Sequence, residues 1–243
     1  FWQTSETIFR QTLAVTDGNY LISHNLCHFL TFKDRLDEAE PFCRAAIADN
    51  PDYFETYNTL GVLQIKRGQF AEAEKNFHET LLRSPNYAAA YSNLALAQLY
   101  QGKPEEAETS LQKASQLNNG EISPPTFVTA LNDLAAVFAK QEKFEKASEN
   151  FGRALYLAPD RADIRADYAL TLAMLKRSDE AQKQIEEAIR QNPNLFTAYN
   201  VQGLIYLEQN KKDEAIRQFE KALELKPDFT EAIGNLKRAK GEK

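Results

Sequence analysis

Prolines recur at a fixed interval along most of this chain. Pro51 and Pro85 are 34 residues apart, and Pro159, Pro193 and Pro227 follow one another at the same interval. The step from Pro85 to Pro159 is 74 residues, which is two periods plus six. A period of this length predicts a stack of repeated supersecondary elements, in which each repeat buries its apolar face against the next.

The period divides the 243 residues into six repeats, which we number from their first residue. The repeats are 20–53, 54–87, 88–121, 128–161, 162–195 and 196–229. An insertion, 122–127, separates the third repeat from the fourth, with Ser123 as a candidate N-cap for the helix that follows. Residues 1–19 align with the second half of a preceding repeat, and residues 230–243 with a capping helix. We expect residues 1–243 to form one superhelical domain.

Aligned repeats share small residues at fixed positions. Position 20 is alanine in all six, and positions 8 and 27 carry Ala, Gly, Cys or Thr. Apolar residues three and four apart form two stripes per repeat, which predicts two successive helices. Gly68, Gly102 and Asn210 tolerate the left-handed conformation that closes a first helix, and the proline ends the second.

These positions resemble the tetratricopeptide repeat. The shared pattern is Leu then Gly or Ala at positions 7 and 8, Ala at 20, Phe at 24, Ala at 27 and Pro at 32. The resemblance implies an all-α fold: a right-handed α-solenoid of six helix pairs, an N-terminal half-repeat helix and a C-terminal capping helix. Asn119, Ser23, Arg165 and Gln202 depart from the pattern, which leaves local packing there open. The pentatricopeptide repeat has a longer period and a basic groove, which this sequence lacks.

Composition narrows the classes of partner. A net charge of -6 disfavours nucleic acid, because phosphate binding draws on clustered Lys and Arg. No run of 18 apolar residues occurs, so we expect no membrane insertion by this chain. The start at Phe1 suggests a piece of a longer protein. Cys27 and Cys43 are too few for a disulfide framework and lack zinc-ribbon spacing, which leaves the redox compartment open.

The family resemblance implies a concave groove, lined by the first helices, that binds a protein or peptide. At positions 9 and 12 the groove candidates are apolar: Val62, Ile65, Leu96, Leu99, Leu170 and Leu204. At positions 5 and 6 they are amides and acids: Asn25, Asn58, Asn93, Asn132, Asp133, Asp167 and Asn200. Such asparagines can hold a peptide backbone as a ladder, similar to that of some glycosyltransferase-associated repeats, and the acids favour basic residues in the ligand. Alternatively, the apolar residues fill contacts between helices and the polar residues are merely solvated.

Signatures of other functions are missing from the sequence. It has no Gly-rich phosphate loop and no HExxH motif, so we expect neither catalysis nor a cofactor. His24 and His28 lie one turn apart, but two imidazoles are too few for a metal site, and an exposed polar pair is the expectation. The clamp that grips chaperone tails in this family needs Lys at position 2 and Arg at position 6. Neither is present in any repeat.

Two functional hypotheses follow. The first is a non-catalytic scaffold that binds a partner protein or peptide in its groove. The second rests on the opening WQTSETIFRQTLAVTDGNYLISHN, which resembles the junction after the membrane spans of polytopic glycosyltransferase-like proteins with these repeats at their C-termini. It implies an extracytoplasmic domain that positions a protein substrate, whereas a free scaffold could be cytoplasmic. The partner and the oligomeric state stay open.

Overall fold

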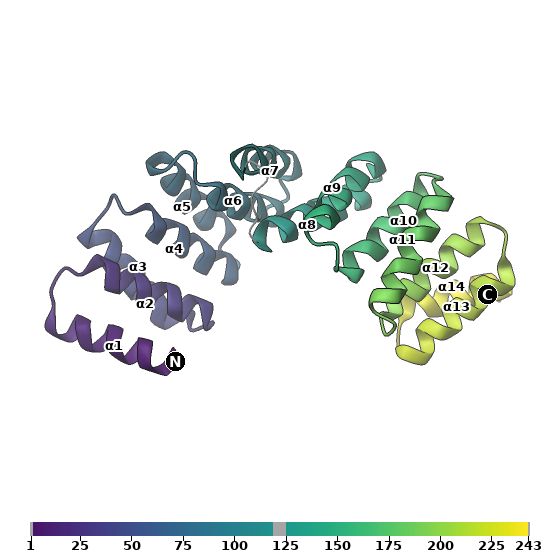
Figure 1. Ribbon diagram of the computed structural model, residues 1–243, viewed down its shortest axis with the longest axis horizontal. Coiled ribbons are helices and arrows are strands. Elements are labelled where there is room, and N and C mark those ends of the chain that lie inside the picture. The colour runs from purple at the N-terminus through teal and green to yellow at the C-terminus, as the bar shows by residue number, and fades with distance from the viewer. Residues whose placement is uncertain (1, 119–124, 243) are drawn as a thin grey trace. The chain divides into compact units, whose positions relative to one another are not determined.

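The computed structural model describes residues 2–118 and 125–242, and Figure 1 shows their arrangement. Within those ranges the chain forms fourteen α-helices and no strand, connected by short turns. The predicted all-α fold of stacked helix pairs is therefore confirmed.

The helices alternate as the repeat predicts. The first helices are α2 (Tyr20–Phe32), α4 (Phe54–Lys66), α6 (Ala88–Tyr100), α8 (Pro125–Lys140), α10 (Ala162–Met174) and α12 (Phe196–Glu208). The second helices are α3 (Leu36–Asp49), α5 (Phe70–Arg83), α7 (Pro104–Asn118), α9 (Phe144–Leu157), α11 (Ser178–Gln191) and α13 (Lys212–Leu225). The flanking helices are α1 (Trp2–Val15) and α14 (Thr230–Lys240). Residues 125–127, assigned above to the insertion, form the first turn of α8, and Ser123 lies outside the described residues.

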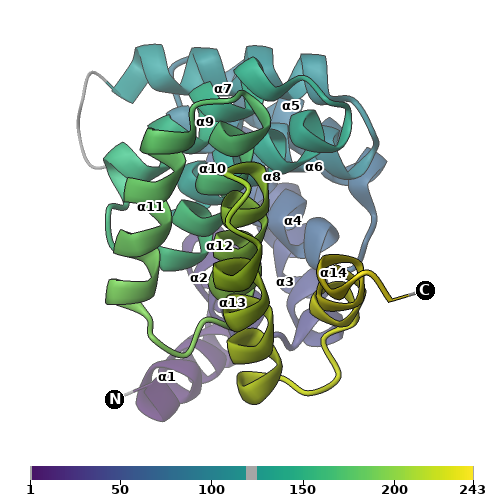
Figure 2. The same ribbon diagram turned by 90° about the vertical axis from the view of Figure 1, so that its right-hand side faces the viewer.

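The chain divides into two compact units, residues 1–130 and 131–243, which we call the N-terminal and C-terminal units. In the N-terminal unit, α1 packs on α2, and the pairs α2/α3, α4/α5 and α6/α7 follow in order. In the C-terminal unit, α10 packs on α11 and α12 on α13, and α14 contacts both α12 and α13 (Figure 2). Each pair buries its apolar stripe against its neighbours, as a solenoid requires.

The core of five of the six repeats combines a small residue at position 8 of the first helix with a large residue at position 24 of the second. All six alanines at position 20 are 0% exposed. At position 8, Gly61 lies so close to Phe77 that a Cβ there would stand 2.5 Å from Cε1 of the ring. Gly203 and Phe219 repeat this arrangement with 2.4 Å. A Cβ at that distance would overlap the ring, so the glycine is needed wherever phenylalanine packs this tightly.

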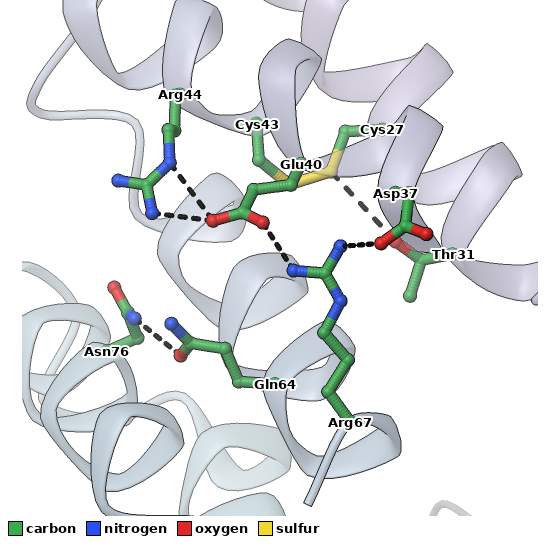
Figure 3. Close-up of polar contacts among 9 residues, drawn as sticks. All are labelled: Cys27, Thr31, Asp37, Glu40, Cys43, Arg44, Gln64, Arg67 and Asn76. Carbon is green, nitrogen blue, oxygen red and sulfur yellow. Dashed lines mark hydrogen bonds and ion pairs between the residues drawn. A yellow bond between two sulfur atoms is a disulfide. The ribbon is translucent and has the colours of Figure 1, made fainter. Parts of the chain in front are cut away.

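The first repeat replaces that contact with a covalent bond (Figure 3). Cys27 at position 8 and Cys43 at position 24 are both fully buried and form a disulfide between α2 and α3. Their Cα atoms are 5.2 Å apart, within the usual range for a disulfide. The sequence excluded a framework of several disulfides but gave no reason to pair these two cysteines. Alignment of positions 8 and 24 as partners is the signal that would have found the bond.

The turn between the two helices of each repeat uses one left-handed residue. Position 15 has positive φ in all six repeats: Asp34, Gly68, Gly102, Glu142, Lys176 and Asn210. The sequence indicated only the Gly and Asn positions, because Asp, Glu and Lys adopt this conformation at a cost. The surrounding helices impose the conformation on all six.

Ion pairs connect successive repeats of the N-terminal unit. Glu6 pairs with Arg35 at 2.8 Å, and Glu74 pairs with Lys103 at 2.8 Å. Between them, Glu40 pairs with Arg67 (Figure 3). Each glutamate occupies position 21 of its repeat, and its partner lies near the turn of the next repeat. Such surface pairs contribute little individually, but their regular placement supports one register of the stack.

Candidate functional site: the first-helix face

The sequence-predicted site residues all lie on the first helices. Each unit has its own first-helix face, formed by α2, α4 and α6 in the N-terminal unit and by residues 131–140 of α8 with α10 and α12 in the C-terminal unit. The structure separates the predicted residues into those that fill contacts between helices and those that stay accessible.

Most of the apolar candidates contribute to the core. Leu96 and Leu99 are 7% exposed. Val62 and Ile65 are half-buried and pack against a cluster that contains Phe77. Leu204 packs in the same way against the cluster of Phe219 in the C-terminal unit. The alternative interpretation, that these side chains fill contacts between adjacent helices, therefore describes these five positions.

One pair of asparagines connects the first helices α4 and α6, and a second pair connects α12 with the capping helix α14. Nδ2 of Asn93 donates to Oδ1 of Asn58 at 2.9 Å. Nδ2 of Asn235 on the capping helix donates to Oδ1 of Asn200, also at 2.9 Å. Asn93, Asn200 and Asn235 are buried, so the amides hold the repeats together and leave little of themselves for a ligand.

Asn132 and Asn25 have different surroundings from those pairs. Asn132 is half-buried, and its Nδ2 donates to the carboxylate of Asp133 at 3.3 Å. Its Oδ1 is buried without a hydrogen-bond partner among the described residues. Asn25 is exposed and is therefore the predicted amide most open to a ligand.

A cavity of about 520 Å³ opens on the first-helix face of the C-terminal unit, and it brings together Asp167 and Leu170 of the predicted set. Its lining residues are Ala136, Ala139, Lys140, Glu142, Phe144, Phe151, Asp167, Leu170, Thr171 and Met174. We call it the α8–α10 cavity. Apart from two charged residues near its rim, Lys140 and Glu142, and from Asp167 and Thr171 on its α10 wall, the walls are apolar.

The cavity exists because the fourth repeat has small residues on this face. Positions 9 and 12 are Ala136 and Ala139, whereas the second, third and sixth repeats carry Val, Ile or Leu at both. In other repeats, larger side chains at these positions fill the contact between helices, as Val62 and Ile65 do in the second repeat. Comparison of positions 9 and 12 between the repeats is the sequence signal that indicates this cavity. Met174 and Phe144, which complete the wall, were not anticipated.

Asp167 is the unusual polar group of this cavity. Its carboxylate is accessible to solvent, but it has no hydrogen-bond or ion-pair partner among the described residues. Desolvation by the surrounding walls raises the pKa of Asp167 to about 6, and the charge of Asp163 adds to the shift. Asp163 itself bonds Arg161 at 2.9 and 2.6 Å, which lowers its pKa.

A second cavity, of about 400 Å³, lies between α1 and α2 in the N-terminal unit. It is lined by Ser5, Phe9, Asn25, His28, Phe29 and Phe32. Phe32 is 71% exposed, so an aromatic ring is open to solvent at the rim. Its occupant is not indicated by any charged group in the lining.

The histidine pair differs from the expectation of two exposed side chains. His28 is exposed, but His24 is buried, with its Nδ1 3.2 Å from Oγ1 of Thr56. Burial lowers the pKa of His24 to about 4, and the neighbouring His28 adds to the shift. Among the described residues, no group of three or more His, Cys, Asp or Glu side chains is placed to hold a metal ion. No helix in the same residues has both the length and the apolar character of a bilayer span.

Two curated relatives extend over different parts of this chain. Human "Protein O-mannosyl-transferase TMTC1" is 28% identical over 111 residues, which are 46% of this chain and 13% of that protein. The "Peroxisomal targeting signal receptor" of Saccharomyces cerevisiae is 28% identical over 209 residues, 83% of this chain and 33% of the receptor. The chain therefore spans a third or less of each of these relatives.

Solved structures share the fold. YrrB, described as a TPR protein with an unusual peptide-binding site, superposes with a TM-score of 0.67 at 21% identity, covering 79% of this chain and 96% of YrrB. PilF of Pseudomonas aeruginosa gives a TM-score of 0.71 at 16% identity, covering 88% and 97%. At these identities the likeness concerns the arrangement of helices.

The family itself is recognised in the sequence in both units. Models described as "Tetratricopeptide repeat" match residues 52–119, 138–203 and 196–229. The matched segments contain the helix pairs whose alanines at position 20 are buried and whose position-8 and position-24 residues pack together. Sequence and structure agree on the same helix pairs, and the chain belongs to the tetratricopeptide repeat family.

Proposed function

We propose that this chain is a non-catalytic scaffold that binds a peptide or an extended segment of a partner protein on a first-helix face. The observation that carries the proposal is the α8–α10 cavity, because most other predicted groove residues already fill contacts between helices. Met174 at its rim is 53% exposed, although it is a large apolar side chain. An exposed apolar side chain next to an apolar cavity is typical of a surface that a partner covers.

The relatives support this class of function. One is named a targeting signal receptor, and one solved structure is described as having a peptide-binding site. Stacked helix pairs suit peptide binding, since neighbouring first helices offer a continuous surface on which an extended chain can lie.

Catalysis is not part of this proposal. The polar residues of the α8–α10 cavity are Asp167, Thr171 and, near its rim, Lys140 and Glu142. No nucleophile with an adjacent general base is among them. The similarity to the human transferase covers less than half of this chain and a small part of that protein, so an enzyme domain would belong to a longer protein.

The proposal is tested by selecting a random heptapeptide phage library on the purified chain. We expect enrichment of a defined sequence class, and we expect Met174→Asp to reduce recovery of those phage at least tenfold, because a charge at the rim disfavours apolar side chains. Tyr156→Asp is the matched control. Tyr156 is 88% exposed on α9 of the same unit and lines no cavity described above. No enrichment, or equal recovery by Met174→Asp and the wild type, would refute the proposal.

A second function is favoured by the buried disulfide. Disulfides form and persist mainly in oxidising compartments, so Cys27–Cys43 supports an extracytoplasmic location. Together with the similarity to the human transferase, it supports the hypothesis that the chain is the extracytoplasmic tail of a membrane-embedded glycosyltransferase-like enzyme and positions its protein substrate. Acid-quenched cells treated with a thiol-reactive polyethylene glycol would test the location. Both cysteines should resist labelling until reduced, and labelling without reductant would contradict it.

A further inference from the structure

The α10 wall of the α8–α10 cavity carries both a carboxylate and apolar side chains. Asp167, Leu170 and Met174 follow one another at intervals of three and four residues along one wall of α10. At 1.5 Å per residue, the wall extends about 10 Å from the carboxylate of Asp167 to the thioether of Met174. The opposite wall is formed by Ala136 and Ala139 of α8, and neither presents a polar side chain.

We propose that the α8–α10 cavity binds a lysine or arginine of a partner peptide together with a neighbouring apolar residue. The charged head of the basic side chain lies at the carboxylate of Asp167, and its aliphatic stem lies along Ala136 and Leu170. The neighbouring apolar side chain occupies the other end, against Met174 and Phe144. The inference rests on the proposed function, and it specifies the chemistry of the peptide.

Charge complementarity favours a basic side chain in the cavity over an apolar or anionic one. Other acids near this end are already engaged: Asp163 bonds Arg161, and Asp133 accepts from Asn132. Two carboxylates line the cavity, Asp167 on its α10 wall and Glu142 in the turn near its rim, and neither has a cation partner in the described residues. A purely apolar ligand would cover the carboxylate of Asp167 without pairing it, which is unfavourable, and an anionic ligand would be repelled. A basic side chain supplies the missing partner and fits the apolar walls with its stem.

The raised pKa of Asp167 supports the same assignment. Because the pKa is about 6 in the folded chain and 3.8 in the reference, the folded state holds the proton more tightly. The unfolding free energy therefore rises as pH falls from about 6 toward 4, and at neutral pH the ionised carboxylate lowers stability. An ionised carboxylate that lies in a cavity and destabilises the unliganded protein is a candidate for ligand binding.

Three other charged groups lie around the cavity. Lys140 on α8 and Glu142 in the following turn lie near the rim, and Asp163 shares the helix of Asp167. The pair of Asp163 with Arg161 keeps its pKa low, so it stays ionised across the same pH range. A change near pH 6 in the affinity for a basic peptide would therefore reflect the ionisation of Asp167.

The first test uses peptides from the random heptapeptide library, synthesised with a fluorescent label and measured by anisotropy against the full chain. We expect the selected sequences to contain Lys or Arg beside an apolar residue. Replacing the basic residue of the peptide with Gln should weaken binding about tenfold, the usual size of one lost charge-assisted hydrogen bond. Asp167→Asn should weaken binding of the original peptide to the same extent and leave binding of the peptide with Gln unchanged.

Matched variants separate the charge from the cavity. Asp163→Asn removes the same charge one turn away and should retain binding, because its carboxylate already has a partner. Ala136→Leu introduces the residue that the third, fifth and sixth repeats carry at position 9, and it should abolish binding by filling the cavity. Asp167→Asn should also raise the melting temperature at pH 7.5, which shows that weaker binding does not come from misfolding.

The outcomes distinguish this inference from the proposed function. Peptides that bind the first-helix face without enrichment in Lys or Arg, or with equal affinity for wild type and Asp167→Asn, would overturn the inference and leave the scaffold in place. A library that yields no binding peptide would refute both the inference and the proposed function. Binding that Asp167→Asn and Asp163→Asn weaken equally would assign the effect to the net charge of the face and would also overturn the inference.

Discussion

Reduction of Cys27–Cys43 is expected to lower the unfolding free energy of the N-terminal unit by about 3 kcal/mol, the size associated with a closed loop of this length. The two cysteines are 16 residues apart, and both are fully buried between α2 and α3. The bond restricts the unfolded chain and holds together a hairpin that lacks the glycine–phenylalanine contact of the second and sixth repeats. Opening it leaves two small thiols where other repeats pack a large side chain.

Urea unfolding of the oxidised and reduced protein measures the effect. Hydrogen exchange of the amides in α2 and α3 follows the N-terminal unit, whereas circular dichroism follows all helices. We expect reductant to shift the midpoint measured for α2 and α3 more than the midpoint of the whole chain. This separation is possible because repeats of a solenoid contact only their neighbours.

Cys27→Gly/Cys43→Phe is the matched variant for this prediction. It introduces the pair that the second repeat forms with Gly61 and Phe77, so it supplies packing without a covalent bond. Its unfolding should be insensitive to reductant, and its stability should exceed that of Cys27→Ala/Cys43→Ala. An unchanged midpoint of the wild type on reduction would show that the bond does not stabilise the fold.

The sequence alone predicts the structure at positions where the same type of residue recurs in successive repeats. Alanine at position 20 recurs six times. A small residue that recurs at a fixed position in an apolar stripe indicates a close contact between helices. The helix pairs and their starts follow from it. The left-handed turn residue Lys176 does not repeat in residue type, and the surrounding structure imposes its conformation.

The candidate site was less accessible to sequence reasoning for the same reason. A leucine at position 9 has the same pattern whether it is buried, as Leu96 is, or packs partly against the core and also lines a cavity, as Leu170 does. The difference depends on the neighbouring first helix, where Ala136 leaves space. Only comparison between repeats at one position indicates such a cavity, because the signal is a missing volume on an adjacent helix.

Gly203→Ala is expected to destabilise the C-terminal unit by about 2 kcal/mol, even though alanine is the better helix former by about 1 kcal/mol. Gly203 lies within α12, and a Cβ there would stand 2.4 Å from Cε1 of Phe219. Phe219 is fully buried, so its ring has little room to move. The cost of overpacking therefore exceeds the gain in helix propensity, and the sign of the effect tests the packing directly.

Two further variants in the same unit decide between packing and propensity in urea unfolding followed by circular dichroism. Gly234→Ala on α14 meets no atom within 4 Å, so it should stabilise by up to about 1 kcal/mol. Phe219→Leu should rescue Gly203→Ala, because the third repeat buries Ala95 and Leu111 at the same two positions. The double-mutant cycle should then give a favourable coupling between the two substitutions. If Gly203→Ala stabilised the unit as Gly234→Ala does, the glycine–phenylalanine contact would not be the constraint that selects glycine at position 8.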